Sequence, residues 1–97
     1  MGDRICVTII DNVGDKSPVL YAHEAGYTII NELNRFYRHK RGDIGMEPSN
    51  AMVNFISWLL NGECTDGDIS IFNEGEEPFP EDEGYFYFNM DTGEVKR

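Results

Sequence analysis

The fold is decided by residues 26–62, GYTIINELNRFYRHKRGDIGMEPSNAMVNFISWLLNG, in the middle of a chain of 97 residues. Apolar residues recur here every three or four positions, the spacing of one face of an α-helix. The first half predicts a helix over residues 26–40, whose apolar face is formed by Ile29, Ile30, Leu33, Phe36 and Tyr37. Basic residues in its last turn suit the negative end of the helix dipole, and Gly42 is typical of a helix end.

A second helix is predicted over residues 48–60. Pro48 is tolerated in a first helical turn, Ser49 and Asn50 are suited to capping, and Asn61-Gly62 forms a C-terminal cap. Its apolar stripe is wide, so we expect this helix to be the more buried of the two. Trp58 lies beside the centre of the stripe, which comprises Met52, Val53, Phe55, Ile56, Leu59 and Leu60.

Strand patterns flank the two helices. Residues 4–10 and 19–23 are rich in β-branched and apolar side chains, and we expect them to pair as an antiparallel hairpin. After the helices, strands are predicted over residues 68–73, 85–88 and 94–96. The order β-β-α-α-β-β-β predicts an α+β fold, a single domain over the whole chain, with one antiparallel sheet and both helices packed on one face.

Residues 85–88, Tyr-Phe-Tyr-Phe, give the strongest strand pattern in the chain. Side chains alternate along a strand, so two of these rings should face the helices and two should face away. Exposed rings on a sheet can stack nucleic-acid bases, but the Lys, Arg and Gly residues that flank such rings in RNA-binding sheets are absent here. Self-association through the open sheet face, giving a homo-oligomer, is the simpler interpretation.

The chain carries 18 acidic and 8 basic residues, a net charge of −10. This charge repels phosphate backbones and anionic membranes, so we expect neither direct nucleic-acid binding nor membrane binding. No apolar stretch approaches the ~20 residues of a membrane span. The acidic excess is concentrated in residues 49–97, which contain 11 acidic and 2 basic side chains.

Residues 74–84 contain six carboxylates and no basic residue. This composition predicts an exposed loop. One interpretation is a binding surface for a protein partner with a basic surface. In its more specific form, the carboxylates mimic the spacing of phosphates. The other is a solvated loop that protects an edge strand from aggregation. The candidate partner-binding residues are Glu76, Glu77, Glu81, Asp82 and Glu83.

A basic cluster ends the first predicted helix. It could hold a phosphate group, pair with the acidic loop or complement the helix end. The cluster consists of Arg35, Arg38, His39, Lys40 and Arg41.

The two cysteines, Cys6 and Cys64, do not form a CxxC pair, so we expect reduced thiols and a cytoplasmic location. Together with His23 and His39 they would supply four zinc ligands. Structural zinc sites, however, draw their ligands from closely spaced pairs, and these residues are far apart. We therefore predict no metal site and no cofactor.

Two segments carry a resemblance. Met1-Gly2-Asp3-Arg4 running into an apolar strand, followed by Leu20-Tyr21-Ala22-His23-Glu24-Ala25-Gly26, resembles a group of small uncharacterised prokaryotic and phage proteins. Members of that group open with MG-x-R and carry a Tyr-x-His-Trp-x-Gly stretch, in which Glu24 here replaces Trp. The resemblance implies a small intracellular domain of mobile-element origin, implies no specific activity, and adds weight to Arg4 and His23.

Together these features predict a non-enzymatic protein-interaction module that uses its acidic half and its aromatic sheet face. Its sharper form is a phage-type inhibitor that acts by negative-charge mimicry. The alternative is a small-ligand or nucleotide-handling enzyme with a site near Arg4, Tyr21 and His23. In that case Arg4 would hold an anion and His23 would transfer a proton.

Overall fold

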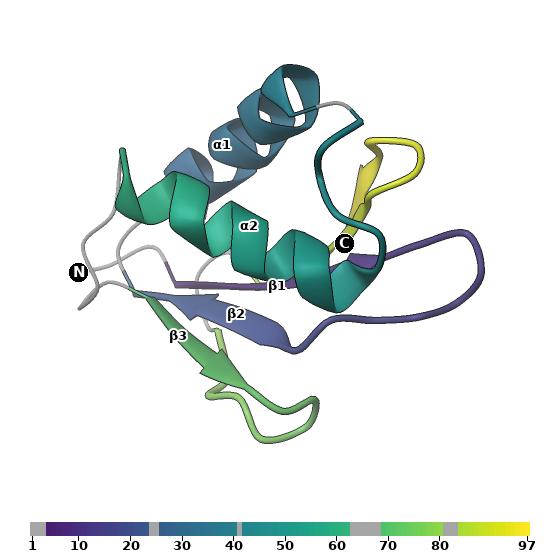
Figure 1. Cartoon of the computed structure of the whole chain (residues 1–97). Helices are drawn as coiled ribbons and strands as arrows, with labels where there is room; N and C mark the ends of the chain where they lie inside the picture. The colour runs from purple at the N-terminus through teal and green to yellow at the C-terminus, as the bar shows by residue number, and fades with distance from the viewer. Residues whose placement is uncertain (1–3, 24–25, 41, 63–68, 81–83) are drawn as a thin grey trace.

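Two helices lie above one five-stranded sheet in the computed structural model, which describes residues 4–23, 26–40, 42–62, 69–80 and 84–97 (Figure 1). The protein is therefore α+β, as predicted. No helix in the described part of the chain is long and apolar enough to cross a membrane. In chain order the elements are β1 (Ile5–Ile10), β2 (Val19–Ala22), α1 (Gly26–His39), α2 (Pro48–Leu60), β3 (Ile69–Phe72), β4 (Gly84–Asn89) and β5 (Val95–Lys96).

The sheet is mixed, and the prediction of a wholly antiparallel sheet is wrong. Its spatial order is β3-β2-β1-β4-β5. The predicted β1–β2 hairpin is present, and β2–β3 and β4–β5 are also antiparallel. β1 and β4, however, run parallel, with Ile5 opposite Gly84 and Ile10 opposite Asn89. The sequence pattern locates each strand but not its partner, and a parallel pair is joined by a long connection rather than by a turn.

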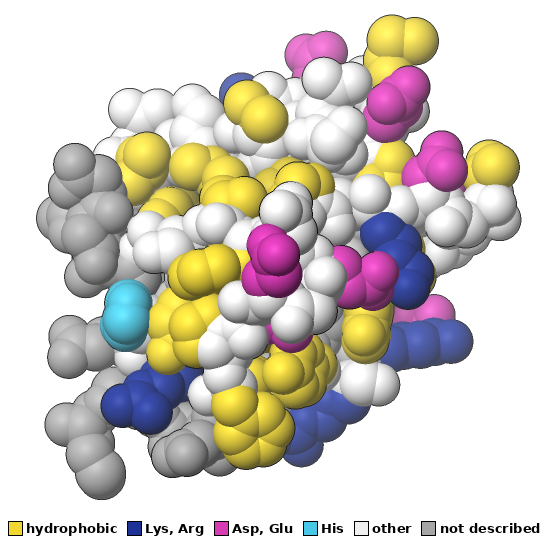
Figure 2. Space-filling model, turned by 90° about the horizontal axis from the view of Figure 1, so that it is seen from below, with side chains coloured by type: hydrophobic (Ala, Val, Ile, Leu, Met, Phe, Trp, Pro, Cys, Tyr) yellow, Lys and Arg dark blue, Asp and Glu magenta, His cyan; other side chains and the backbone are white. Residues whose placement is uncertain are grey.

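The chain must cross from one side of the β2–β1 pair to the other between β3 and β4. The described part of this connection, residues 73–80, lies on the side of the sheet opposite the helices (Figure 1). Figure 2 views that side directly and shows apolar side chains interspersed with carboxylates. This covering segment is exposed along most of its length, as its charge predicted, but it contacts the sheet where the Pro78 carbonyl oxygen accepts from Cys6 and where Pro80 is buried.

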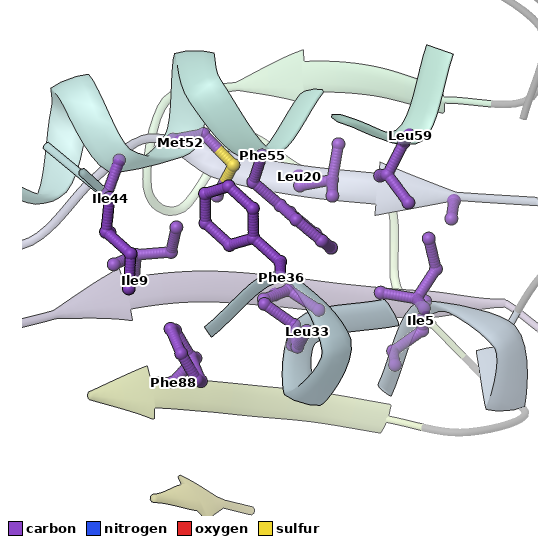
Figure 3. Close-up of a cluster of buried hydrophobic side chains, with 14 residues drawn as sticks. Ile5, Ile9, Leu20, Leu33, Phe36, Ile44, Met52, Phe55, Leu59 and Phe88 are labelled. Carbon is purple, nitrogen blue, oxygen red and sulfur yellow. The ribbon is translucent and has the colours of Figure 1, made fainter. Parts of the chain in front are cut away.

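The main core lies between the sheet and the two helices. Alternation along β1 directs Ile5, Val7 and Ile9 to this side, where they meet the apolar faces of α1 and α2 (Figure 3). Ile44, in the segment between the helices, completes the cluster beside Ile9. Val53 and Leu60 are exposed, so the apolar stripe of α2 is wider than the surface that the sheet covers.

The four consecutive aromatic residues of β4 alternate as predicted. Phe88 is fully buried on the helix side, and Phe86 packs against the same cluster. Tyr85 and Tyr87 lie opposite Cys6 and Thr8 of β1, on the other face. One strand therefore contributes to the main core and also supplies tyrosines to the face that residues 73–80 approach.

Candidate functional site

Residues 73–80 are held against the sheet by specific contacts. The Cys6 thiol donates to the carbonyl oxygen of Pro78 across 3.7 Å, and Pro80 is buried. At the other end of the segment, Glu74 forms an ion pair with Lys16 at 3.2 Å. The segment is thus fixed to β1 and to the β1–β2 connection, and its carboxylates have defined positions.

Two carboxylates of this segment accept hydrogen bonds from within it. Glu76 accepts from the Asn73 side-chain amide at 2.9 Å, and Glu77 accepts from the backbone N–H of Gly75 at 2.8 Å. These local bonds restrict the positions of the two side chains. Glu81, Asp82 and Glu83, the other predicted partner-binding residues, lie outside the described residues.

An exposed aromatic pair lies close to Glu77. The rings of Phe79 and Tyr85 lie 6.4 Å apart between centroids, and Phe79 is 69% exposed. The pKa of the Tyr85 hydroxyl is raised, first by desolvation and then by nearby charges that include Glu77. We call this set the aromatic–acidic surface; it consists of Glu74, Glu76, Glu77, Phe79 and Tyr85.

Cys6 lies beneath this surface and is only 1% exposed. Burial, together with the negative charge of Glu77, raises the pKa of its thiol to about 11. A thiol with such a pKa stays protonated near neutral pH, whereas nucleophilic cysteines have depressed pKa values. Cys6 therefore serves as an apolar contact and a weak donor to the covering segment.

Arg4, Tyr21 and His23 lie at one end of the β1–β2 pair. Arg4 precedes the paired Ile5 and His23 follows its partner Ala22, so the strand register brings both residues to the same end. The His23 ring packs edge-on against Tyr21 at 4.8 Å, and Tyr21 is buried with Phe72 on its other side. None of the three residues lines either of two surface hollows, one between α1 and α2 and one along α1.

A groove between α1 and α2 was not predicted from the sequence. Its volume is about 520 Å³, and the buried carboxylate of Glu32 lies in its wall. Glu32 accepts from the Trp58 indole N–H at 2.8 Å and from the Arg35 guanidinium at 2.9 Å. The other lining residues are Phe36, Lys40, Asp43, Asn54, Ser57, Asn61 and Gly62.

The groove escaped prediction because its central contact joins two helices. Glu32 and Trp58 are separated by 26 positions in the chain, and helical periodicity identifies only their separate faces. The one available signal was the position of Trp58 beside the apolar stripe, because a half-buried indole needs an acceptor for its N–H. Arg35 bonds Glu32 rather than an acidic residue of the covering segment, whose Glu74 pairs with Lys16.

Metal ligands are not assembled in the described part of the chain, where no group of three or more His, Cys, Asp or Glu side chains could hold an ion. Of the four potential zinc ligands, Cys6 is buried beneath the sheet, while His39 stacks on Trp58 on the helix side. Cys64 lies outside the described residues.

Comparison with protein-family models, with curated proteins and with solved structures finds no match. The resemblance in residues 1–4 and 20–26 to small prokaryotic and phage proteins therefore stays a prediction. Function has to be inferred from the aromatic–acidic surface and from the groove between the helices.

Proposed function

We propose that this protein binds a basic partner protein through the aromatic–acidic surface. The observation that carries the proposal is the contact between the exposed ring of Phe79, on a segment that also presents three glutamates, and the ring of Tyr85 on β4. Exposed aromatic rings that touch one another and are bordered by charge are typical of interaction sites.

Arginine and lysine side chains have the chemistry to occupy this surface. Their cationic groups can lie over the rings of Phe79 and Tyr85 and pair with the carboxylates of Glu76 and Glu77, while their aliphatic stems pack on the same rings. The net charge of −10 attracts a basic partner before contact and speeds the encounter.

The partner class follows from this chemistry. Proteins that bind nucleic acids present lysine and arginine side chains in rows, at positions that suit phosphates. A surface of ordered carboxylates on this protein would occupy the same side chains and exclude the nucleic acid. The function we propose is thus that of a protein-interaction module, with inhibition of a nucleic-acid-binding protein as its most specific form.

The test is binding to a fluorescently labelled polyarginine peptide, followed by anisotropy at low and at high salt. We expect saturable binding that weakens steeply with salt, because exposed charges are screened. The variant Glu74→Gln/Glu76→Gln/Glu77→Gln should bind about tenfold more weakly. Phe79→Ala should weaken binding at both salt concentrations, because it removes ring contacts rather than charge.

The matched control is Asp15→Asn/Glu47→Gln/Glu94→Gln, which changes the net charge equally but at exposed carboxylates elsewhere. It should retain most of the binding. Equal loss in the two triple variants would show that only total charge matters and would overturn the proposal. Sedimentation that shows a wild-type dimer, lost in Phe79→Ala, would mean that a second copy occupies the surface instead.

A further inference from the structure

The groove between α1 and α2 contains the carboxylate of Glu32. Burying this charge reduces the stability of the fold unless its oxygens accept hydrogen bonds. The Glu32 side chain is 8% exposed, and a buried charge is tolerated only with good hydrogen-bond partners. Its two oxygens accept separately, one from Trp58 at 2.8 Å and one from Arg35 at 2.9 Å. A single side chain thus fixes both an aromatic ring and a guanidinium in the wall of one groove.

Arg35 retains hydrogen-bonding capacity in this arrangement. Within the described residues it bonds Glu32 through Nη1 alone, and its side chain is 51% exposed. Its other N–H groups can therefore bind a planar or tetrahedral anion. Lys40, which is exposed, lines the same groove and has no ion-pair partner among the residues that the structure describes.

Trp58 supplies a flat apolar wall beside these cations. Its ring is half-buried, stacks on His39 at 5.7 Å and meets the edge of Phe36 at 5.9 Å. These contacts and the bond to Glu32 hold the indole in one orientation. The groove volume of about 520 Å³ lies within the range of small-molecule sites, roughly 300–1,000 Å³.

We propose that this groove binds a small molecule that combines a planar aromatic ring with one anionic group. The ring stacks on Trp58, and the anion is held by Arg35 and Lys40. Asp43 and Asn54, which also line the groove, supply an acceptor and an amide for polar substituents on the ring. Nucleoside monophosphates and aromatic carboxylates share this chemistry.

Trp58 is the single tryptophan of the chain, so its fluorescence reports directly on the groove. The probes are adenosine monophosphate and benzoate, each paired with an uncharged counterpart, adenosine and benzamide. We expect a saturable change in Trp58 emission with a charged probe and binding at least about tenfold weaker with its uncharged counterpart. Saturation by adenosine monophosphate alone identifies the nucleotide class, and saturation by benzoate alone identifies the carboxylate class.

Two variants with the same net charge test whether Lys40 binds the anionic group of the probe. Lys40→Gln should weaken binding of the charged probe about tenfold and leave its uncharged counterpart unaffected. Arg38→Gln changes an exposed residue of α1 that lies two positions before Lys40 and does not line the groove, and it should bind normally. Since both positions are exposed, neither change threatens folding. A flat titration with all four probes, equal response to charged and uncharged probes, or equal loss in the two variants would overturn the proposal.

Discussion

The two faces of the sheet are covered in different ways. On the helix side, fourteen buried residues from the sheet, both helices and the connection between them form one apolar cluster (Figure 3). On the opposite side, Cys6, Val19 and Tyr21 form a small cluster with the partly buried Phe72, and an acidic segment lies against it. The first face contains most of the apolar burial that stabilises the fold, whereas the second leaves aromatic rings and carboxylates at the surface.

The comparison teaches that an exposed acidic connection can still contact a sheet at a few points. Residues 73–80 contain three glutamates and are exposed apart from the part-buried Glu77 and the buried Pro80, yet the Pro78 carbonyl oxygen accepts from Cys6 of the sheet. Because few apolar contacts hold this cover, it should open at a lower free-energy cost than the helix side.

The largest expected effect is on the helix side. Phe36 is fully buried and packs against Phe55, with ring centroids 5.3 Å apart. Phe36→Ala should reduce the free energy of unfolding by about 3–5 kcal/mol, because it removes a large side chain and leaves a cavity. The measurement is urea denaturation followed by circular dichroism.

The corresponding change on the other face is Phe72→Ala, which removes a half-buried ring that meets Tyr21 at 6.1 Å. We expect a loss of about 1–2 kcal/mol. Equal destabilisation by the two substitutions would mean that both faces of the sheet contribute equally to stability, which would contradict the difference proposed between them.

An intermediate effect concerns pH, because the Cys6 thiol titrates differently in the folded and unfolded chains. Its pKa rises from 9.0 to about 11 on folding. Its contribution to stability is therefore fully present below pH 9 and is lost as the pH rises toward 11, where the unfolded chain binds fewer protons. From pH 8 to pH 10.5 the loss should be about 2 kcal/mol.

The comparison variant is Cys6→Ser, which keeps a donor for the Pro78 carbonyl but does not titrate in this range. The stability of this variant should fall less than that of the wild type between the two pH values, as measured by urea denaturation at each pH. Parallel losses in the two proteins would assign the alkaline transition to other groups.

The smallest effect is expected at the ion pair between Lys16 and Glu74, whose side chains are 50% and 65% exposed. Lys16→Met should change the free energy of unfolding by no more than about 0.5 kcal/mol, since exposed ion pairs contribute little. Denaturation in low salt is the appropriate measurement. A loss well above 1 kcal/mol would mean that this charge pair, rather than the contacts of Cys6 and Pro78, holds the cover in place.

Local sequence patterns predicted where the helices and strands lie, but not which strands pair with each other. The two predicted helices match α1 and α2 closely, because apolar spacing is a property of the local sequence, and Asn61 is the C-cap as expected. The expected capping by Ser49 or Asn50 is wrong, because α2 already begins at Pro48 and its N-cap position, Glu47, makes no side-chain cap hydrogen bond. The pairing of β1 with β4 depends on residues far apart in the chain. A signal for it existed, since β1 is buried and largely apolar on both faces, and strands covered on both faces are typical of parallel pairing.

The candidate sites show the same limit. Glu76 and Glu77 were predicted from composition, but their contact region with Phe79 and Tyr85 arises from a crossover that the sequence pattern does not encode. The groove at Glu32 and Trp58 requires the relative placement of two helices, which is set by packing in three dimensions.

The parallel pairing of β1 with β4 also orders events during synthesis. Ile5 is translated first, and its partner Gly84 follows only 79 positions later in the chain. At translation rates of about 5–20 residues per second, the first strand lacks one neighbour for on the order of ten seconds. In that interval the N–H and C=O groups along one edge of β1 are unpaired and open to other chains, so the growing polypeptide is more prone to aggregate until β4 has been translated.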